Sequence, residues 1–359
     1  MKNDAEEESK IVIENSGGDS VSDSITNILK EGILRAFTEK VQRGEIAIED
    51  LEQRIQKFLG GECVAELFMT MTEEISSDSV GTIESIMYEK VLEERAFSDE
   101  FLARQNQKWG KAFAASEALY LCVLESTEHY VAHVVKEHEG EVNYVYCALK
   151  YIHARALQIY SEIMCLIQNG FADGAYARWR SLYELSVVAS FIKKYGSQVA
   201  EEYVKSSGSK VRNEWARSAS CFRGKKKSSK ISFKDLFDNS DINEAWNKEY
   251  QFTNLLVHGS SDGTFSRLGT YGNAQVMSVG RSDWGMSISA IHAAVSLIVI
   301  TTEFFTVYTH GDSIVAAMTF YKWISRIESF YTEVEENCFP KDIDTLPMDV
   351  QTHGVIKLG

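Results

Sequence analysis

Apolar residues recur along most of the chain at the three- and four-residue spacing of amphipathic helices. Residues 145–166 keep this spacing without a miss, at Val145, Leu149, Ile152, Ala156, Ile159, Ile163 and Leu166. Asn169 and Gly170 then supply a C-terminal cap, and Asp173 is placed to cap the next helix, which runs to Lys194. The short link predicts that these two helices form an antiparallel hairpin.

The same periodicity predicts helices on both sides of this hairpin. They are expected over residues 24–59, 62–103 and 116–135, then from about 241 to 257, from about 282 to 308, and in a last stretch from Ile314 onwards. The two prolines, Pro340 and Pro347, leave residues 1–339 without a proline break. Residues 262–283 are rich in glycine and predict a loop or one small β-hairpin near 270–280. We therefore predict an all-α fold, a multi-helix bundle of long amphipathic antiparallel helices.

Changes in composition divide the chain into four regions. Residues 1–22 are acidic with Gly and Ser, which is typical of a disordered tail. An N-terminal helical region over 23–110, a core helical domain over 111–335 and a C-terminal tail over 336–359 follow. Residues 71–100 hold nine acidic and two basic residues, which indicates a solvated helix face.

The overall charge and the cysteines indicate which ligands and which cellular compartment are compatible with the sequence. A net charge of −15 argues against nucleic acid binding over the whole surface and leaves a local basic patch open. The six cysteines are widely spaced without a C-x-x-C pair, so we expect reduced, buried core cysteines in a cytoplasmic protein. The first residues lack the apolar stretch of a secretory signal.

Two further features are interpreted as structural. Residues 284–302 contain no charged side chain, but scattered Ser and Thr residues and the helical spacing of Ile288 and Ile298 favour a buried core helix over a membrane span. His129 and His133 are four residues apart at an exposed helix end rich in glutamate, and no metal site is predicted there. No cofactor-binding motif is present, so no cofactor is expected.

Candidate chemistry is concentrated in two polar pairs on apolar helices. Arg180 and Glu184 are four residues apart, and so are Asn254 and His258, so each pair shares one helix face. Each pair can be structural, as an intrahelical ion pair or a capping histidine. Together they also supply a fixed cation, a carboxylate, a neutral donor and a proton-transfer group. Metal-free RNA cleavage needs these groups to activate a 2′-hydroxyl, to stabilise the phosphorane and to protonate the leaving oxygen.

A basic stretch follows between the two pairs. Residues 205–234 hold ten Lys and Arg and one acid, Glu214. Their tip is either a solubilising loop or a sequence-independent contact for a phosphate backbone, with candidate residues Arg223, Lys225, Lys226, Lys227 and Lys230. Trp215 and Phe222 nearby either stack on bases or anchor the loop in the core.

The segments Gly170 to Glu184 and Val257 to Ser260 resemble a family of uncharacterised all-helical bacterial proteins. That pattern is a small-residue turn, an Arg-x-x-x-Glu helix and a later helix that ends in His, and here it covers about residues 110–310. Such proteins are often encoded among mobile elements and anti-phage genes, so the resemblance implies a defence- or toxin-type role. Asn254 and His258 are distantly similar to the motif of HEPN ribonucleases. Thr253 stands where that motif has Arg, so Arg180 would substitute for it.

Two functions stay open on this evidence. In the first, Arg180, Glu184, Asn254 and His258 form a metal-independent, ribonuclease-like or phosphate-binding site, with RNA or a nucleotide as ligand. In the second, the same residues form a structural network in a non-enzymatic interaction or sensor module. A homo-oligomer or a partner protein is expected in either case, and no membrane.

Overall fold

The computed structural model describes residues 38, 40–50, 52–54, 62–208, 211–226, 228–257, 261, 268–271, 274–282, 284–338 and 354–357. It divides into two units, Met1–Glu94 and Arg95–Gly359. The expected tail over 1–22 and most of the helix expected over 24–59 lie outside the described residues. In the first unit a short 3-10 helix, η1 (Ile48–Asp50), precedes the beginning of α3 (Glu62–Glu137).

The long helix α3 corrects the expected helix boundaries. Residues 62–103 and 116–135 are parts of one helix of 76 residues, and the division at residue 94 falls inside it. The segment between them contains Gln105, Trp109 and Phe113, which are all buried. Its inward-facing residues continue the apolar face instead of interrupting it, so the helix has no reason to end there.

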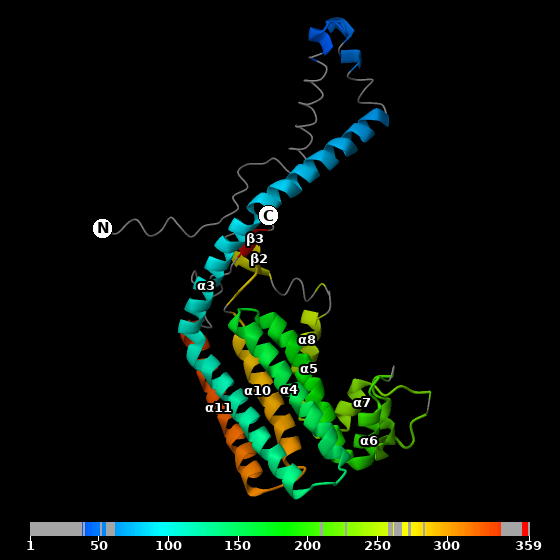
Figure 1. Cartoon of the computed structure of the whole chain (residues 1–359), viewed down its shortest axis with the longest axis vertical. Coiled ribbons are helices and arrows are strands. Elements are labelled where there is room, and N and C mark those ends of the chain that lie inside the picture. Colours follow the sequence, from blue (N-terminus) through cyan, green and yellow to red (C-terminus); the bar gives the residue numbers. More distant parts are fainter. Residues whose placement is uncertain are drawn as a thin grey trace, which may run out of the picture. The chain divides into compact units, whose positions relative to one another are not determined.

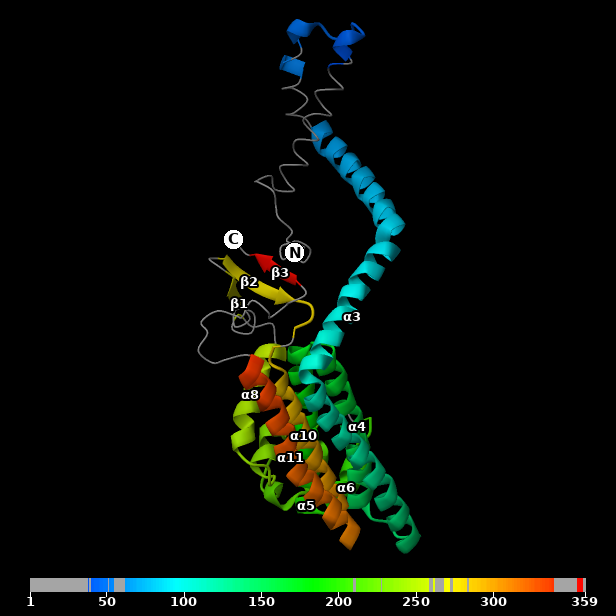
Figure 2. The ribbon, with the colours of Figure 1, turned by 90° about the vertical axis from the view of Figure 1, so that its left-hand side faces the viewer.

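The second unit is a helical bundle, as the periodicity predicts (Figure 1). Its main helices are the second half of α3, α4 (Tyr144–Gln168), α5 (Ala172–Tyr195), α10 (Met286–Phe305) and α11 (Gly311–Cys338). These run side by side in both views (Figures 1 and 2). The shorter helices α6 (Ser197–Lys205), α7 (Phe233–Asp238) and α8 (Ala245–Val257) complete the unit. The all-α fold class is therefore confirmed.

Helix α10 is the centre of this bundle, because it packs against α4, α5 and α11. By length and composition alone it could cross a membrane, with a mean hydropathy of 1.8, and no other helix in the described part of the chain could. Here its small residues Ala290, Ala293 and Ala294 are fully buried against neighbouring helices. Ile298 is buried as expected, whereas Ile288 is half-exposed and lies outside the packed face.

The α4–α5 connection is the tight hairpin expected from the sequence. Phe171 N–H bonds to the Leu166 carbonyl at 2.8 Å and Gly170 N–H to the Ile167 carbonyl at 2.9 Å, which is a Schellman cap. Gly170 has a φ of +79°, and a Cβ there would lie 2.8 Å from the Phe101 ring. The expected cap at Asp173 is wrong, because α5 already begins at Ala172 and Asp173 lies inside its first turn.

Two more features follow from the described residues. The hairpin expected near 270–280 is present as β1 (Leu268–Tyr271) and β2 (Ala274–Val279), and β3 (Gly354–Lys357) pairs antiparallel with β2. The five cysteines whose side chains are described are free and none is buried, which corrects the expectation of core cysteines. Cys122 shows why. Its helix neighbours Leu119 and Val123 point inward, and the thiol lies on the opposite, outward side.

Candidate functional site

Helix α8 lies against α5, so the helices that carry the two predicted polar pairs are in contact. The Tyr176 hydroxyl on α5 donates to the Glu249 carboxylate on α8 at 3.0 Å. Two turns further along α5, Glu184 accepts from the hydroxyl of Tyr250, the next residue of α8, at 2.7 Å. The two helices are therefore held together by polar contacts at two points.

Glu184 is the centre of this polar contact, and its side chain is 17% exposed. Its Oε1 accepts from Tyr250 and, at 3.4 Å, from Arg180 Nε one turn earlier. Its Oε2 accepts from Arg212, which follows α6. A carboxylate removed this far from water needs such partners. We call Arg180, Glu184, Arg212 and Tyr250 the α5–α8 site.

Arg180 has a fixed position in the α5–α8 site. Its guanidinium carbon lies 4.5 Å from the centre of the Tyr250 ring, in a cation–π contact, and its side chain is 24% exposed. Tyr250 is itself buried. Burial is the main cause that raises the pKa of its phenol, and the hydrogen bond to the Glu184 carboxylate raises this pKa further. Two guanidiniums and one carboxylate leave one net positive charge, which suits a phosphate group.

The second predicted pair is only partly within the described structure. Asn254 belongs to α8, one helical turn beyond Tyr250, which places its backbone on the same side of the helix as Tyr250. The position of its side chain and the whole of His258 lie outside the described residues. Direct contact between Arg180 or Glu184 and His258 therefore stays a prediction.

The basic segment divides into structural and exposed residues. Trp215 and Phe222 are buried, so they anchor the segment in the core, and 3-10 helices η2 (Glu214–Ser218) and η3 (Ser220–Phe222) carry them. Lys225 pairs with Asp235 at 2.7 Å and lies 5.5 Å from the Phe222 ring, so its charge is used within the fold.

Three of the remaining candidates for a phosphate contact, Arg223, Lys226 and Lys230, are exposed. The fourth, Lys227, lies outside the described residues. Exposed cations of this kind can contact a nucleic acid backbone without breaking an internal ion pair.

Residues 146–275 match a family of unknown function, DUF5677. The match runs from α4 to the start of β2, so it includes the α5–α8 site, the basic segment, Asn254 and His258. It covers 130 of the 359 residues (275 − 146 + 1). No curated protein and no solved structure matches the chain. The helical architecture agrees with the resemblance to a helical family of undefined function, and the likeness to HEPN ribonucleases stays a prediction.

Sequence reasoning missed Arg212 and Tyr250, which both hold Glu184, and it also missed a histidine that packs against α5 and α8. His292 of α10 is surrounded by aromatic rings, with centroids at 4.8 Å for Trp179 and 4.9 Å for Trp246. Its Nδ1 is buried without a hydrogen-bond partner among the described residues. Burial lowers the pKa of His292 to about 4, against the opposing effect of Glu249, so the imidazole is neutral at pH 7. In the sequence it is one polar residue in an apolar helix, which is the pattern of a core histidine.

Proposed function

We propose that the α5–α8 site binds a phosphate group of RNA and, with His258, forms a metal-independent ribonuclease. The observation that carries this proposal is the contact of both Arg180 and Arg212 with the one carboxylate of Glu184. The side chain of Arg212 is 74% exposed, whereas that of Arg180 is only 24% exposed. Glu184 therefore holds one cation that faces the solvent and one that is fixed in position. Such a preorganised pair supports charge that develops on phosphorus during cleavage.

The roles of the residues follow from their chemistry. His258 removes the proton from the 2′-hydroxyl, which attacks phosphorus while the bond to the 5′-oxygen breaks. The products are a 2′,3′-cyclic phosphate and a free 5′-hydroxyl, and the proton passes to the leaving oxygen. Asn254 supplies a neutral hydrogen bond to the phosphate. We assign Glu184 a positioning role, because its oxygens already hold Arg180, Arg212 and Tyr250.

The exposed basic residues between 223 and 230 would bind the part of the RNA strand that lies outside the cleavage site. Arg223, Lys226 and Lys230 would hold the backbone by charge and without sequence preference. In a bacterial cytoplasm an activity of this kind would act as a defence- or toxin-type effector, as the family resemblance implies. Its binding should weaken steeply as salt concentration rises.

The test compares two arginines of one helix. Arg180 and Arg178 have similarly exposed side chains, at 24% and 26%, but Arg178 pairs with Glu162 of α4 and not with the α5–α8 site. Cleavage of total RNA by purified protein should disappear in Arg180→Ala and His258→Ala and persist in Arg178→Ala. Equal cleavage by all three variants and the wild type, with the fold intact by circular dichroism, would refute the proposal.

A second function is favoured by the first part of α3, as an interaction module. Between residues 69 and 92 this helix carries nine large apolar side chains that are at least 42% exposed: Met69, Ile75, Val80, Ile83, Ile86, Met87, Tyr88, Val91 and Leu92. Exposed apolar surface of this extent is typical of an interface. Ile83→Lys should then lower the molar mass measured by light scattering, whereas Glu84→Lys on the same turn should not. An unchanged mass in Ile83→Lys would exclude self-association through this part of α3.

A further inference from the structure

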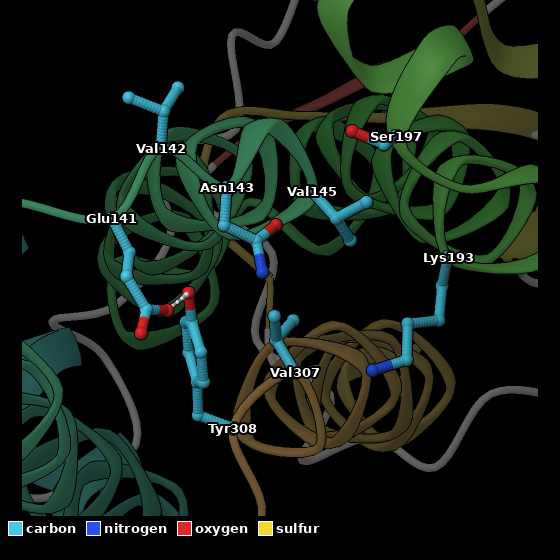
Figure 3. Close-up of a pocket in the computed structure, with 8 residues that line it drawn as sticks. All are labelled: Glu141, Val142, Asn143, Val145, Lys193, Ser197, Val307 and Tyr308. Carbon is cyan, nitrogen blue, oxygen red and sulfur yellow. Dashed lines mark hydrogen bonds between the residues drawn. The ribbon is translucent and has the colours of Figure 1, made fainter. Parts of the chain in front are cut away.

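A pocket of about 540 Å³ opens at one end of the bundle (Figure 3), and none of its lining residues belongs to the α5–α8 site. It lies among the start of α4, the end of α5, the start of α6 and the residues that follow α10. Ligand pockets in proteins have volumes of roughly 300–1,000 Å³, and the volume of this open pocket falls within that range. Its polar groups differ between two sides, so a bound molecule would have one preferred orientation.

One side presents the ammonium of Lys193. This lysine is half-buried, and burial lowers its pKa, against the opposing effect of Glu303. Among the described residues no carboxylate oxygen lies within 4 Å of its Nζ, whereas Lys194 beside it pairs with Asp241 at 2.7 Å. A lysine that loses part of its hydration without gaining a close carboxylate is poorly stabilised as a cation, and an anionic ligand would correct this.

Two neutral donors, Asn143 and Ser197, line the same pocket as Lys193. Asn143 caps α4 through its Oδ1, which accepts from Tyr146 N–H at 3.1 Å. This bond directs the amide NH₂ of Asn143 toward the pocket, where the Lys193 ammonium also points (Figure 3). The Ser197 hydroxyl also lines the pocket. One ammonium with neutral N–H and O–H donors suits the several oxygens of a phosphate, which lysine binds as a point charge.

The opposite side presents an acceptor. Glu141 lines the pocket beside Tyr308, whose hydroxyl donates to it at 3.4 Å, and His138 lies 3.1 Å from the same oxygen. A carboxylate repels phosphate but accepts hydrogen bonds from sugar hydroxyls. In Figure 3, Val145 and Val307 lie between Lys193 on one side and Asn143, Tyr308 and Glu141 on the other.

We propose that this pocket binds a phosphorylated ligand with hydroxyl groups, a sugar phosphate or a nucleotide. Its phosphate contacts Lys193 and Asn143, and a hydroxyl donates to Glu141. The site is separate from the proposed RNA site, so it would serve as a second, effector-type binding site on the same domain. Ribose 5-phosphate, adenosine monophosphate and inorganic phosphate are the probes that distinguish the forms of the ligand.

Calorimetric titration of the full chain tests the proposal with a matched pair of lysines. Ribose 5-phosphate should bind at least about tenfold more weakly to Lys193→Gln, because a charge-assisted hydrogen bond is lost. Its affinity for Lys194→Gln should stay within about twofold of the wild type, since that lysine pairs with Asp241 and does not line the pocket. Tighter binding of adenosine monophosphate would identify a nucleotide, and equal binding a sugar phosphate.

Two further variants separate the possible failures. Glu141→Gln should weaken binding of ribose 5-phosphate and leave inorganic phosphate unchanged or improved. Arg180→Ala should leave both affinities unchanged, whatever its effect on RNA cleavage. The proposal is overturned if neither organic phosphate binds below about 10 mM. It is also overturned if Lys193→Gln binds like the wild type, or if Arg180→Ala rather than Lys193→Gln removes binding.

Discussion

Replacing Glu184 by Gln measures what the α5–α8 site contributes to stability. The largest loss is the 2.7 Å bond from the buried Tyr250 hydroxyl, because hydrogen bonds to charged groups contribute about 1.5–3 kcal/mol. The Arg180 contact is long, at 3.4 Å, and partly exposed, so we assign it about 0.5 kcal/mol. Arg212 is 74% exposed, and screening by water reduces its contribution to less than about 0.5 kcal/mol.

Because the glutamine can still accept one of these bonds, we expect Glu184→Gln to lower the free energy of unfolding by about 2 kcal/mol. For a unit of this size that corresponds to a fall in Tm of about 4–8 °C. Arg212→Gln should lower Tm by less than about 2 °C. Urea and thermal unfolding followed by circular dichroism measure both, and a double-mutant cycle with Tyr250→Phe should give a coupling of about 1–2 kcal/mol.

Tyr250 is a buried partner of the Glu184 carboxylate, and Arg212 is an exposed partner of the same group. If Arg212→Gln destabilised the protein as much as Glu184→Gln, the exposed ion pair would dominate and the assignment of energies would be wrong. A coupling near zero between Glu184 and Tyr250 would show that their hydrogen bond does not hold α8 on α5. Either result would also remove the structural support for a preorganised Arg180.

Three other predictions follow from single contacts. Gly170→Ala should cost about 2 kcal/mol in thermal unfolding, because its positive φ and the crowding around a Cβ both oppose a side chain, whereas Gly174→Ala inside α5 should be neutral or stabilising. Burial lowers the pKa of His153 to about 3 in the folded protein. Below about pH 6.5 the unfolded state therefore binds a proton at this histidine, whereas the folded state does not until the pH approaches 3. Stability should therefore fall as pH decreases from 6.5 to 3, by about 2 kcal/mol at pH 5, and His153→Gln should lack this component in urea titrations at pH 7 and 5. Lys226→Gln should reduce the salt dependence of RNA binding without changing Tm. Lys225→Gln breaks an internal ion pair, so it should lower Tm by a few degrees. The reverse result would place the RNA contact at Lys225.

Much of the fold could be predicted because each long helix has a clear periodicity. The α4 positions from Leu149 to Ile163 are buried as the spacing indicates, and Asn169 with Gly170 ends the helix through backbone bonds that local sequence encodes. The continuity of α3 could not be predicted in the same way. Residues 104–115 look like a break until other helices provide contacts for Trp109 and Phe113.

The candidate site was predictable only where its partners are local. Arg180 and Glu184 are four residues apart, so their contact follows from helix geometry. The contacts of Glu184 with Tyr250 and Arg212 cross 66 and 28 residues, and no periodicity indicates them. His292 and Lys193 were missed for the same reason, since the rings and the pocket around them come from several helices.

The turn between α4 and α5 is closed by residues from a distant part of the chain. Arg281 donates to the carbonyl and side chain of Asn169 across 112 residues, and Ser282 N–H bonds to the Gly170 carbonyl at 2.9 Å. The intervening segment, which carries the α5–α8 site, is therefore a closed loop. Closing it costs conformational entropy, which the bonds at the turn and the packing of α10 against α4 and α5 offset. During synthesis the chain must therefore extend to residue 282 before these bonds to the α4–α5 turn can form.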